Sequence, residues 1–76
     1  MADRLPRVTG EELLRALLRD GWAITRQSGS HAILHHVVKA GRVNVPRHRG
    51  KTLKVATVAA ILDSAGLTIE ELQTLL

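Results

Sequence analysis

The sequence predicts a small α+β domain, a two-layer sandwich in which helices cover one face of a three-stranded antiparallel sheet. Leucines at helical spacing mark both ends of the chain, and the middle alternates apolar and polar residues between glycine-containing turns. With 76 residues the chain is long enough for one small domain. We therefore expect a single domain over residues 1–76 that begins with a loosely held arm over 1–8.

The first helix is expected over residues 9–21. Thr9 and Glu12 have the spacing of a capping box, in which each side chain accepts a hydrogen bond from the other residue's backbone N–H. Gly21 suits the left-handed conformation that ends many helices. The apolar stripe at helical spacing consists of Leu13, Leu14, Leu17 and Leu18.

Three strands are expected next. The first covers 22–27 and begins with Trp22, which we assign to the core rather than to a surface on which bases stack. The second strand, over 31–38, follows a Ser-Gly-Ser turn and is rich in β-forming residues. The third covers 42–45 and ends at Pro46, because proline cannot donate to a central ladder.

A basic loop over 47–52 leads to a second helix over 53–66 and a short extra C-terminal helix over 68–76. Thr68 and Glu71 repeat the capping-box spacing. The order α-β-β-β-α is similar to that of double-stranded-RNA-binding domains, although a fold does not determine a function. The residues expected to face the core are Leu53, Ala56, Ala59, Ala60 and Leu62 in the second helix and Leu72, Leu75 and Leu76 in the last.

The positive charge is concentrated in the middle of the chain. The net charge is +4, and no acidic residue lies between Gly21 and Leu62. A surface of one sign favours an anionic partner, most simply nucleic acid, although a solvated basic surface is the alternative. Lysines at the start of a helix add to the free N–H groups that a phosphate can bind. The residues expected to contact phosphates are Arg47, His48, Arg49, Lys51 and Lys54.

Several classes of protein are disfavoured by composition. The chain has no cysteine, no apolar segment of membrane-spanning length and no signal-peptide pattern. We therefore expect a cytoplasmic protein without membrane association. A metal site is not expected either, because His31 and His35 share a strand face but lie about 13 Å apart, while zinc ligands lie about 2 Å from their ion. No cofactor is expected.

His31 is the histidine of greatest interest. It follows the turn at the rim of the sheet, where a rigid scaffold can present a side chain to a ligand. A histidine can give or take a proton near neutral pH, so His31 is either a catalytic group or a surface residue. Ser30 either braces its ring or is an ordinary turn residue.

The chain resembles the HicA (YcfA-like) toxins of bacterial and archaeal toxin–antitoxin systems. The resemblance rests on LLRDGW before the first strand, GSHAIL around the turn, VNVPRHRGKTLK, and VAAILDSAGLTIEELQTLL, in the order and spacing of the family. It covers residues from about 9 to 76. The chain departs from the family at 54–57, where Lys-Val-Ala-Thr replaces a Lys-Gly-Thr-like segment.

The resemblance implies the toxin of a type II toxin–antitoxin system with a fold similar to the double-stranded-RNA-binding domain. It implies an endoribonuclease that cleaves messenger RNA and is neutralised by a HicB-type antitoxin protein covering the active site. It also implies that His31 is catalytic, with Gly29 as the turn glycine and Ser30 beside it. We expect metal-independent cleavage, in which the 2′-hydroxyl of RNA attacks the adjacent phosphorus.

Two other functions remain compatible with the sequence. One is a non-catalytic double-stranded-RNA-binding module, and the other is a module that only docks a protein partner. Neither needs the Gly-Ser-His motif. If the chain is a nuclease, the group that protonates the leaving oxygen is His48, Ser30 or a lysine, and the sequence does not choose among them.

Overall fold

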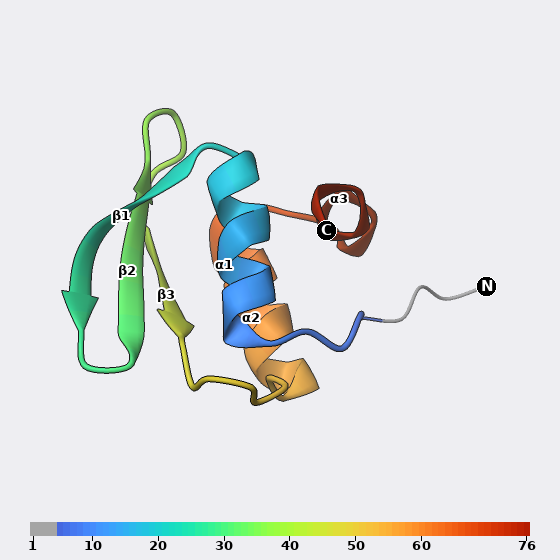
Figure 1. Cartoon of the computed structure of the whole chain (residues 1–76). Coiled ribbons are helices and arrows are strands. Elements are labelled where there is room, and N and C mark those ends of the chain that lie inside the picture. The colour runs from blue at the N-terminus through green and yellow to red at the C-terminus, as the bar shows by residue number, and fades with distance from the viewer. Residues whose placement is uncertain (1–4) are drawn as a thin grey trace.

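The computed structural model describes residues 5–76 and confirms the predicted α+β sandwich (Figure 1). The strands pair antiparallel in the order β1-β2-β3. The helices lie on one side of this sheet and leave its other face uncovered (Figure 1). The elements are α1 (Gly10–Arg19), β1 (Trp22–Ser28), β2 (His31–His36), β3 (Arg42–Pro46), α2 (Val55–Ala65) and α3 (Ile69–Leu75).

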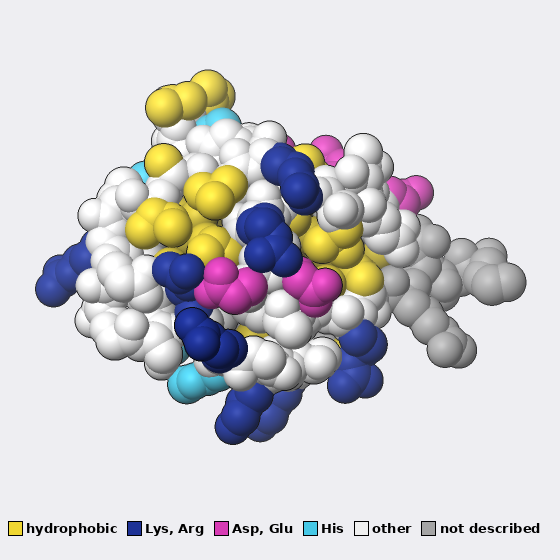
Figure 2. Space-filling model, in the orientation of Figure 1, with side chains coloured by type: hydrophobic (Ala, Val, Ile, Leu, Met, Phe, Trp, Pro, Cys, Tyr) yellow, Lys and Arg dark blue, Asp and Glu magenta, His cyan; other side chains and the backbone are white. Residues whose placement is uncertain are grey.

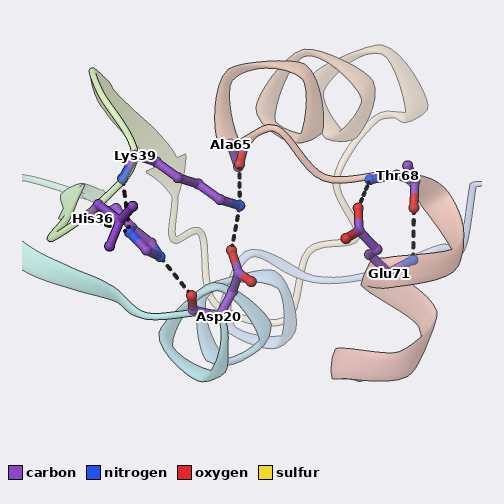
Figure 3. Close-up of polar contacts among 7 residues, drawn as sticks. Asp20, His36, Lys39, Ala65, Thr68 and Glu71 are labelled. Atoms are coloured by element: carbon purple, nitrogen blue, oxygen red, sulfur yellow. Dashed lines mark hydrogen bonds and ion pairs between the residues drawn. The ribbon is translucent and has the colours of Figure 1, made fainter.

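The helix ends follow the predicted local signals. Thr9 caps α1, with Glu12 completing the capping box, and Thr68 caps α3 with Glu71 in the same way (Figure 3). Gly21 follows α1 with a φ of 104°, as its predicted role requires. These hydrogen bonds satisfy backbone N–H groups that a helix leaves unpaired at its start.

The core lies between the inner face of the sheet and the helices. Trp22 is buried as predicted, and its ring meets His36 edge-on at 5.2 Å between centroids. Apolar residues of all three strands pack against leucines of α1 and aliphatic residues of α2 and α3. The main members of this core are Leu13, Leu17, Ala32, Leu34, Val43, Val45, Val58, Ile61, Leu62 and Leu72.

The predicted buried face of α2 is right at Leu62 but wrong at its alanines. The helix begins at Val55, and its buried residues are Val58, Ile61, Leu62 and Ala65, whose spacing defines one helical face. Larger aliphatic side chains bury more apolar area than alanine does, so they take the core-facing positions. Leu53 is buried, but it precedes the helix. The exposed residues are Ala56, Ala59 and Ala60, and Leu76, expected on the apolar side of α3, is 47% exposed.

Strand β2 is shorter than predicted, because the chain turns away after His36. The Nδ1 atom of His36 accepts hydrogen bonds from the backbone N–H groups of Val38 and Lys39, at 3.0 and 3.1 Å. Val37 and Val38 are consequently 94% and 84% exposed in the β2–β3 loop. Hydrophobic side chains project from this end of the molecule at the top of Figure 2.

Lys39 ties the same loop to two helices (Figure 3). Its Nζ atom donates to the Asp20 carboxylate at 2.8 Å and to the Ala65 carbonyl at 2.9 Å. The other ring nitrogen of His36, Nε2, donates to the Asp20 carbonyl at 2.8 Å. The loop is therefore fastened to the C-terminal ends of α1 and α2.

The segment predicted as a loose arm is partly packed. Residues 1–4 lie outside the part of the chain that the structure describes. Val8 is buried, and its carbonyl accepts the backbone N–H of Leu53 at 2.7 Å. Of the helices in residues 5–76, none has the length and apolar character needed to cross a bilayer.

Candidate active site

A two-residue turn places His31 at the end of the sheet. Ser28 and His31 pair across the hairpin, with Gly29 and Ser30 between them. Gly29 has a φ of 58°, whereas Ser30 is not among the residues with positive φ, which is the pattern of a type II′ turn. Glycine is favoured here by the backbone conformation and not by lack of room, because an added Cβ would meet open space.

His31 is held by a residue of the neighbouring strand. Its ring lies on the uncovered face of the sheet, and its Nδ1 atom lies 2.9 Å from the Oδ1 atom of Asn44 on β3. An amide oxygen only accepts hydrogen bonds, so this bond requires the imidazole proton on Nδ1. The lone pair of Nε2 is then directed away from Asn44 and is available to accept a proton from a ligand.

The sequence reasoning missed Asn44. In the segment RVNV it is an exposed polar position in an alternating strand, which is normally uninformative. Only the register joins it to His31, because Pro46 pairs with His31 and Asn44 lies two residues away on the same face. The alternation would have identified Asn44 as a neighbour if this register had been predicted.

His48 is a predicted site residue whose ring the structure places near that of His31. The two ring centroids lie 6.3 Å apart, and the rings are nearly perpendicular, at 79°. His48 is exposed in the loop that follows β3. A small anion between the two rings would be within reach of both imidazoles.

Arg47 is bound to other parts of the protein. Its guanidinium donates to Glu11 at 2.6 and 3.3 Å and to the Gln27 side chain at 2.7 Å, and its backbone N–H donates to the Ser30 carbonyl. The hydrogen bond from Arg47 holds the pKa of the Glu11 carboxyl below its usual value. Arg47 thus fastens the His31 turn to α1, and its contact with an external phosphate stays a prediction.

The other predicted phosphate ligands are exposed around the β3–α2 loop. Arg49 and Lys51 project from the loop, and Lys54 is the N-cap residue of α2, which has no side-chain cap and no acid in its first turn. Within residues 5–76 the ion pairs are Lys39–Asp20 and Arg47–Glu11, so these three cations are free to meet an anion. Figure 2 shows Lys and Arg side chains gathered at this lower end.

The histidines do not gather as metal ligands. His35 bonds the Thr25 hydroxyl at 2.7 Å on the uncovered face, while His36 lies on the helical side of the sheet. In the described part of the chain, no three histidine or acidic side chains are grouped so that they could hold a metal ion. The candidate site therefore consists of two imidazoles, one amide and a basic loop.

Comparison with known proteins bears on what this site does. A family model described as "HicA toxin of bacterial toxin-antitoxin" matches residues 10–67. The match extends from the start of α1 past the end of α2, so it contains His31, Asn44, His48 and the whole basic loop. No curated protein matches the chain.

Proposed function

The chain belongs to the HicA toxin family of bacterial toxin–antitoxin systems, and from this membership and the geometry around His31 we propose that it is an endoribonuclease. Membership makes it the toxin of a toxin–antitoxin pair, with an antitoxin as its partner. The observation that carries the proposal is the His31–Asn44 hydrogen bond, which leaves Nε2 of an exposed histidine free to act as a base. The proposed substrate is messenger RNA in the cytoplasm.

RNA carries its own nucleophile, so the protein needs to supply a base, an acid and electrostatic support. In the proposed reaction, Nε2 of His31 takes the proton of a 2′-hydroxyl as that oxygen forms a bond to the adjacent phosphorus. The bond from phosphorus to the 5′-oxygen breaks, and a 2′,3′-cyclic phosphate remains. One positioned acid or base contributes about 100- to 10,000-fold to such a rate.

His48 is the proposed acid for the leaving oxygen. Its ring centroid lies 6.3 Å from that of His31, a separation that supports a phosphorus bound between the two rings. In that arrangement a protonated His48 donates its proton to the 5′-oxygen as the bond to phosphorus breaks. No metal ion is required in this scheme, because both proton transfers use imidazoles.

The basic loop is proposed to bind the RNA backbone. Arg49, Lys51 and Lys54 are exposed and free of ion pairs, so their charges are available to phosphate oxygens and to the charge that develops at phosphorus. Arg47 contributes through its fixed position beside the His31 turn. The same positive surface suits an antitoxin of HicB type, which would neutralise the toxin by covering His31.

A non-catalytic double-stranded-RNA-binding module is the second candidate function. It is favoured by the order of elements and by two lysines, Lys51 in the preceding loop and Lys54 at the start of α2. It gives no reason for the His31–Asn44 hydrogen bond, and we rank it lower for that reason.

The test is cleavage of RNA by the purified chain and by His31→Ala, each with and without EDTA. His35→Ala is the matched control, because His35 lies on the same strand and the same exposed face but bonds Thr25. We expect cleavage by the wild type and by the control in EDTA, and none by folded His31→Ala. Equal cleavage by His31→Ala would refute the assignment, and RNA binding without cleavage by any of the proteins would favour the binding module.

A further inference from the structure

A groove lies between β3 and α2 and opens beside His31. Its volume is about 560 Å³, within the range of about 300–1,000 Å³ that is usual for pockets holding small molecules. One wall is formed by β3 and the other by α2, and the lining includes exposed residues of both as well as two buried core residues, Val43 and Ile61. The lining residues on β3 are Arg42, Val43, Asn44 and Pro46, and those on α2 are Ala56, Thr57, Ala60, Ile61 and Ser64.

The groove exists because the α2 wall is made of short side chains. Ala56, Ala60 and Ser64 recur at a spacing of four and therefore lie in one row along the helix. Strand β3 is the edge of the sheet, and within residues 5–76 no strand pairs with its other side. Helix α2 runs back along this edge in Figure 1, so the groove follows the length of β3.

The side chains at the ends of the groove favour an anionic occupant. His31 lies at the end next to Pro46, and Arg42 lies at the opposite end of β3. The register places these ends about 13 Å apart, because Arg42 pairs with His35, four residues from His31. None of the lining residues is acidic.

We propose that this groove binds the RNA nucleotide on the 5′ side of the cleaved bond. Its 2′-hydroxyl meets His31, its base lies against α2, and its own 5′-phosphate meets Arg42. This inference rests on the proposed function, since it takes His31 as the base of the reaction.

The lining suits a nucleobase. Ala56 and Ala60 offer an exposed apolar surface to the face of a base. The hydroxyl groups of Thr57 and Ser64 offer donors and acceptors to its edge. Such contacts discriminate among bases, so the groove is a determinant of cleavage specificity.

An extended peptide is the competing occupant, because a free strand edge can accept another strand. A peptide uses the backbone of β3 and needs neither a histidine nor an arginine at the ends of the groove. The charge pattern therefore favours RNA, and the two occupants respond differently to mononucleotides.

The first test is a titration of the ¹⁵N-labelled protein with each of the four nucleoside 3′-monophosphates, and with the corresponding 3′,5′-bisphosphates. We compare the wild type with Ala60→Leu, which fills the groove, and with Ala59→Leu, a matched control on the same helix outside the lining. Leucine keeps helix propensity close to that of alanine. These titrations report binding without any cleavage.

We expect shifts of the Val43, Thr57, Ala60 and Ser64 amides, stronger for one base than for the others. Ala60→Leu is expected to weaken binding about tenfold, as loss of base stacking does, while Ala59→Leu binds like the wild type. Arg42→Gln should weaken only the bisphosphates. Unchanged groove amides, or equal binding by Ala60→Leu, would overturn the proposal and leave a peptide as the better occupant.

A cleavage assay separates this proposal from the proposed function. If the wild type cleaves RNA and Ala60→Leu retains its rate and base preference, the groove assignment is wrong and the nuclease remains. If the wild type neither cleaves RNA nor binds any of the nucleotides, both proposals fail.

Discussion

The hydrogen bond between His31 and Asn44 crosses from β2 to β3, with 2.9 Å between Nδ1 and Oδ1. It depends on the register in which His31 pairs with Pro46 and Ile33 pairs with Asn44. A residue outside the Gly-Ser-His motif therefore determines which nitrogen of the ring can accept a proton. In the proposed reaction Asn44 is a positioning residue, since it acts through His31.

Replacing Asn44 tests this relationship. Asn44→Ala should lower kcat about 10- to 100-fold with little change in KM, because the ring loses the partner that orients it. Asn44→Asp should retain most activity, because a carboxylate also accepts the Nδ1 proton. Its charge favours the protonated imidazole, so the acidic limb of the pH–rate profile should move to higher pH. Steady-state kinetics across pH measure all three effects.

Two outcomes would count against this role for Asn44. A rise in KM without a fall in kcat would indicate that Asn44 only binds substrate. A similar fall in kcat for Asn44→Ala and Asn44→Asp would indicate that the shape of the Asn44 side chain, and not its hydrogen bond to His31, determines the rate. Ile33→Val, a conservative change at the position that pairs with Asn44, controls for disturbance of the strand.

His48 is tested with a substrate whose leaving group needs no proton. His48→Ala should slow RNA cleavage about 100-fold or more, as expected for loss of a general acid. With a 3′-(p-nitrophenyl phosphate) ester of a nucleoside, the variant should approach the wild-type rate, because nitrophenolate leaves unprotonated. An equal defect on both substrates would mean that His48 binds phosphate instead.

The sequence predicts best those features that depend on neighbours along the chain. The two Thr-x-x-Glu capping boxes and the positive φ of Gly21 after α1 involve residues within one or two turns. The place of His31 at the rim of the sheet follows from its position after the turn. Because these parts of the fold and of the candidate site depend on short-range contacts, the local sequence is enough to predict them.

The features that were missed depend on packing between elements. The buried face of α2 is decided by how well Val58, Ile61 and Leu62 fill the core, which composition alone does not reveal. The early end of β2 depends on His36 bonding the turned backbone. Asn44 required the β2–β3 register, which is a pairing between two strands.

The Glu11–Arg47 pair predicts a dependence of stability on pH. Because Arg47 lowers the pKa of Glu11 in the folded protein, the pair stabilises the fold at neutral pH. This contribution is lost as the pH falls from the normal range of a carboxylic acid through the lowered pKa. Glu11→Gln should therefore be less stable than the wild type at pH 7. In acid the free energies of unfolding of the two proteins should converge.

Chemical denaturation at a series of pH values measures this convergence. Glu12→Gln is an unsuitable control, because Glu12 caps α1, whereas Glu70→Gln changes an exposed acid outside the capping boxes. If the free energies of unfolding of Glu11→Gln and the wild type differed by the same amount at every pH, the result would contradict an ionic contribution from this pair.

Lys39 and Lys51 predict opposite outcomes for the same substitution. Lys39→Met keeps the aliphatic stem of the side chain but removes its hydrogen bonds to Asp20 and Ala65. Because the site is half-buried, the substitution should lower the free energy of unfolding by about 1 kcal/mol. For a domain of this size that corresponds to a fall in Tm of about 4–8 °C. RNA cleavage below Tm should persist, because the Lys39 loop lies at the opposite end of β2 from His31.

Lys51→Met removes an equal charge from an exposed position in the basic loop. It should change the free energy of unfolding by no more than about 0.5 kcal/mol. RNA binding should weaken, and the slope of log K against log salt concentration should fall in magnitude by about one. Thermal denaturation and salt-dependent binding of both variants check the pair. If Lys39→Met weakened RNA binding as strongly as Lys51→Met, overall charge would explain both results, and the phosphate contact assigned to the loop would be wrong.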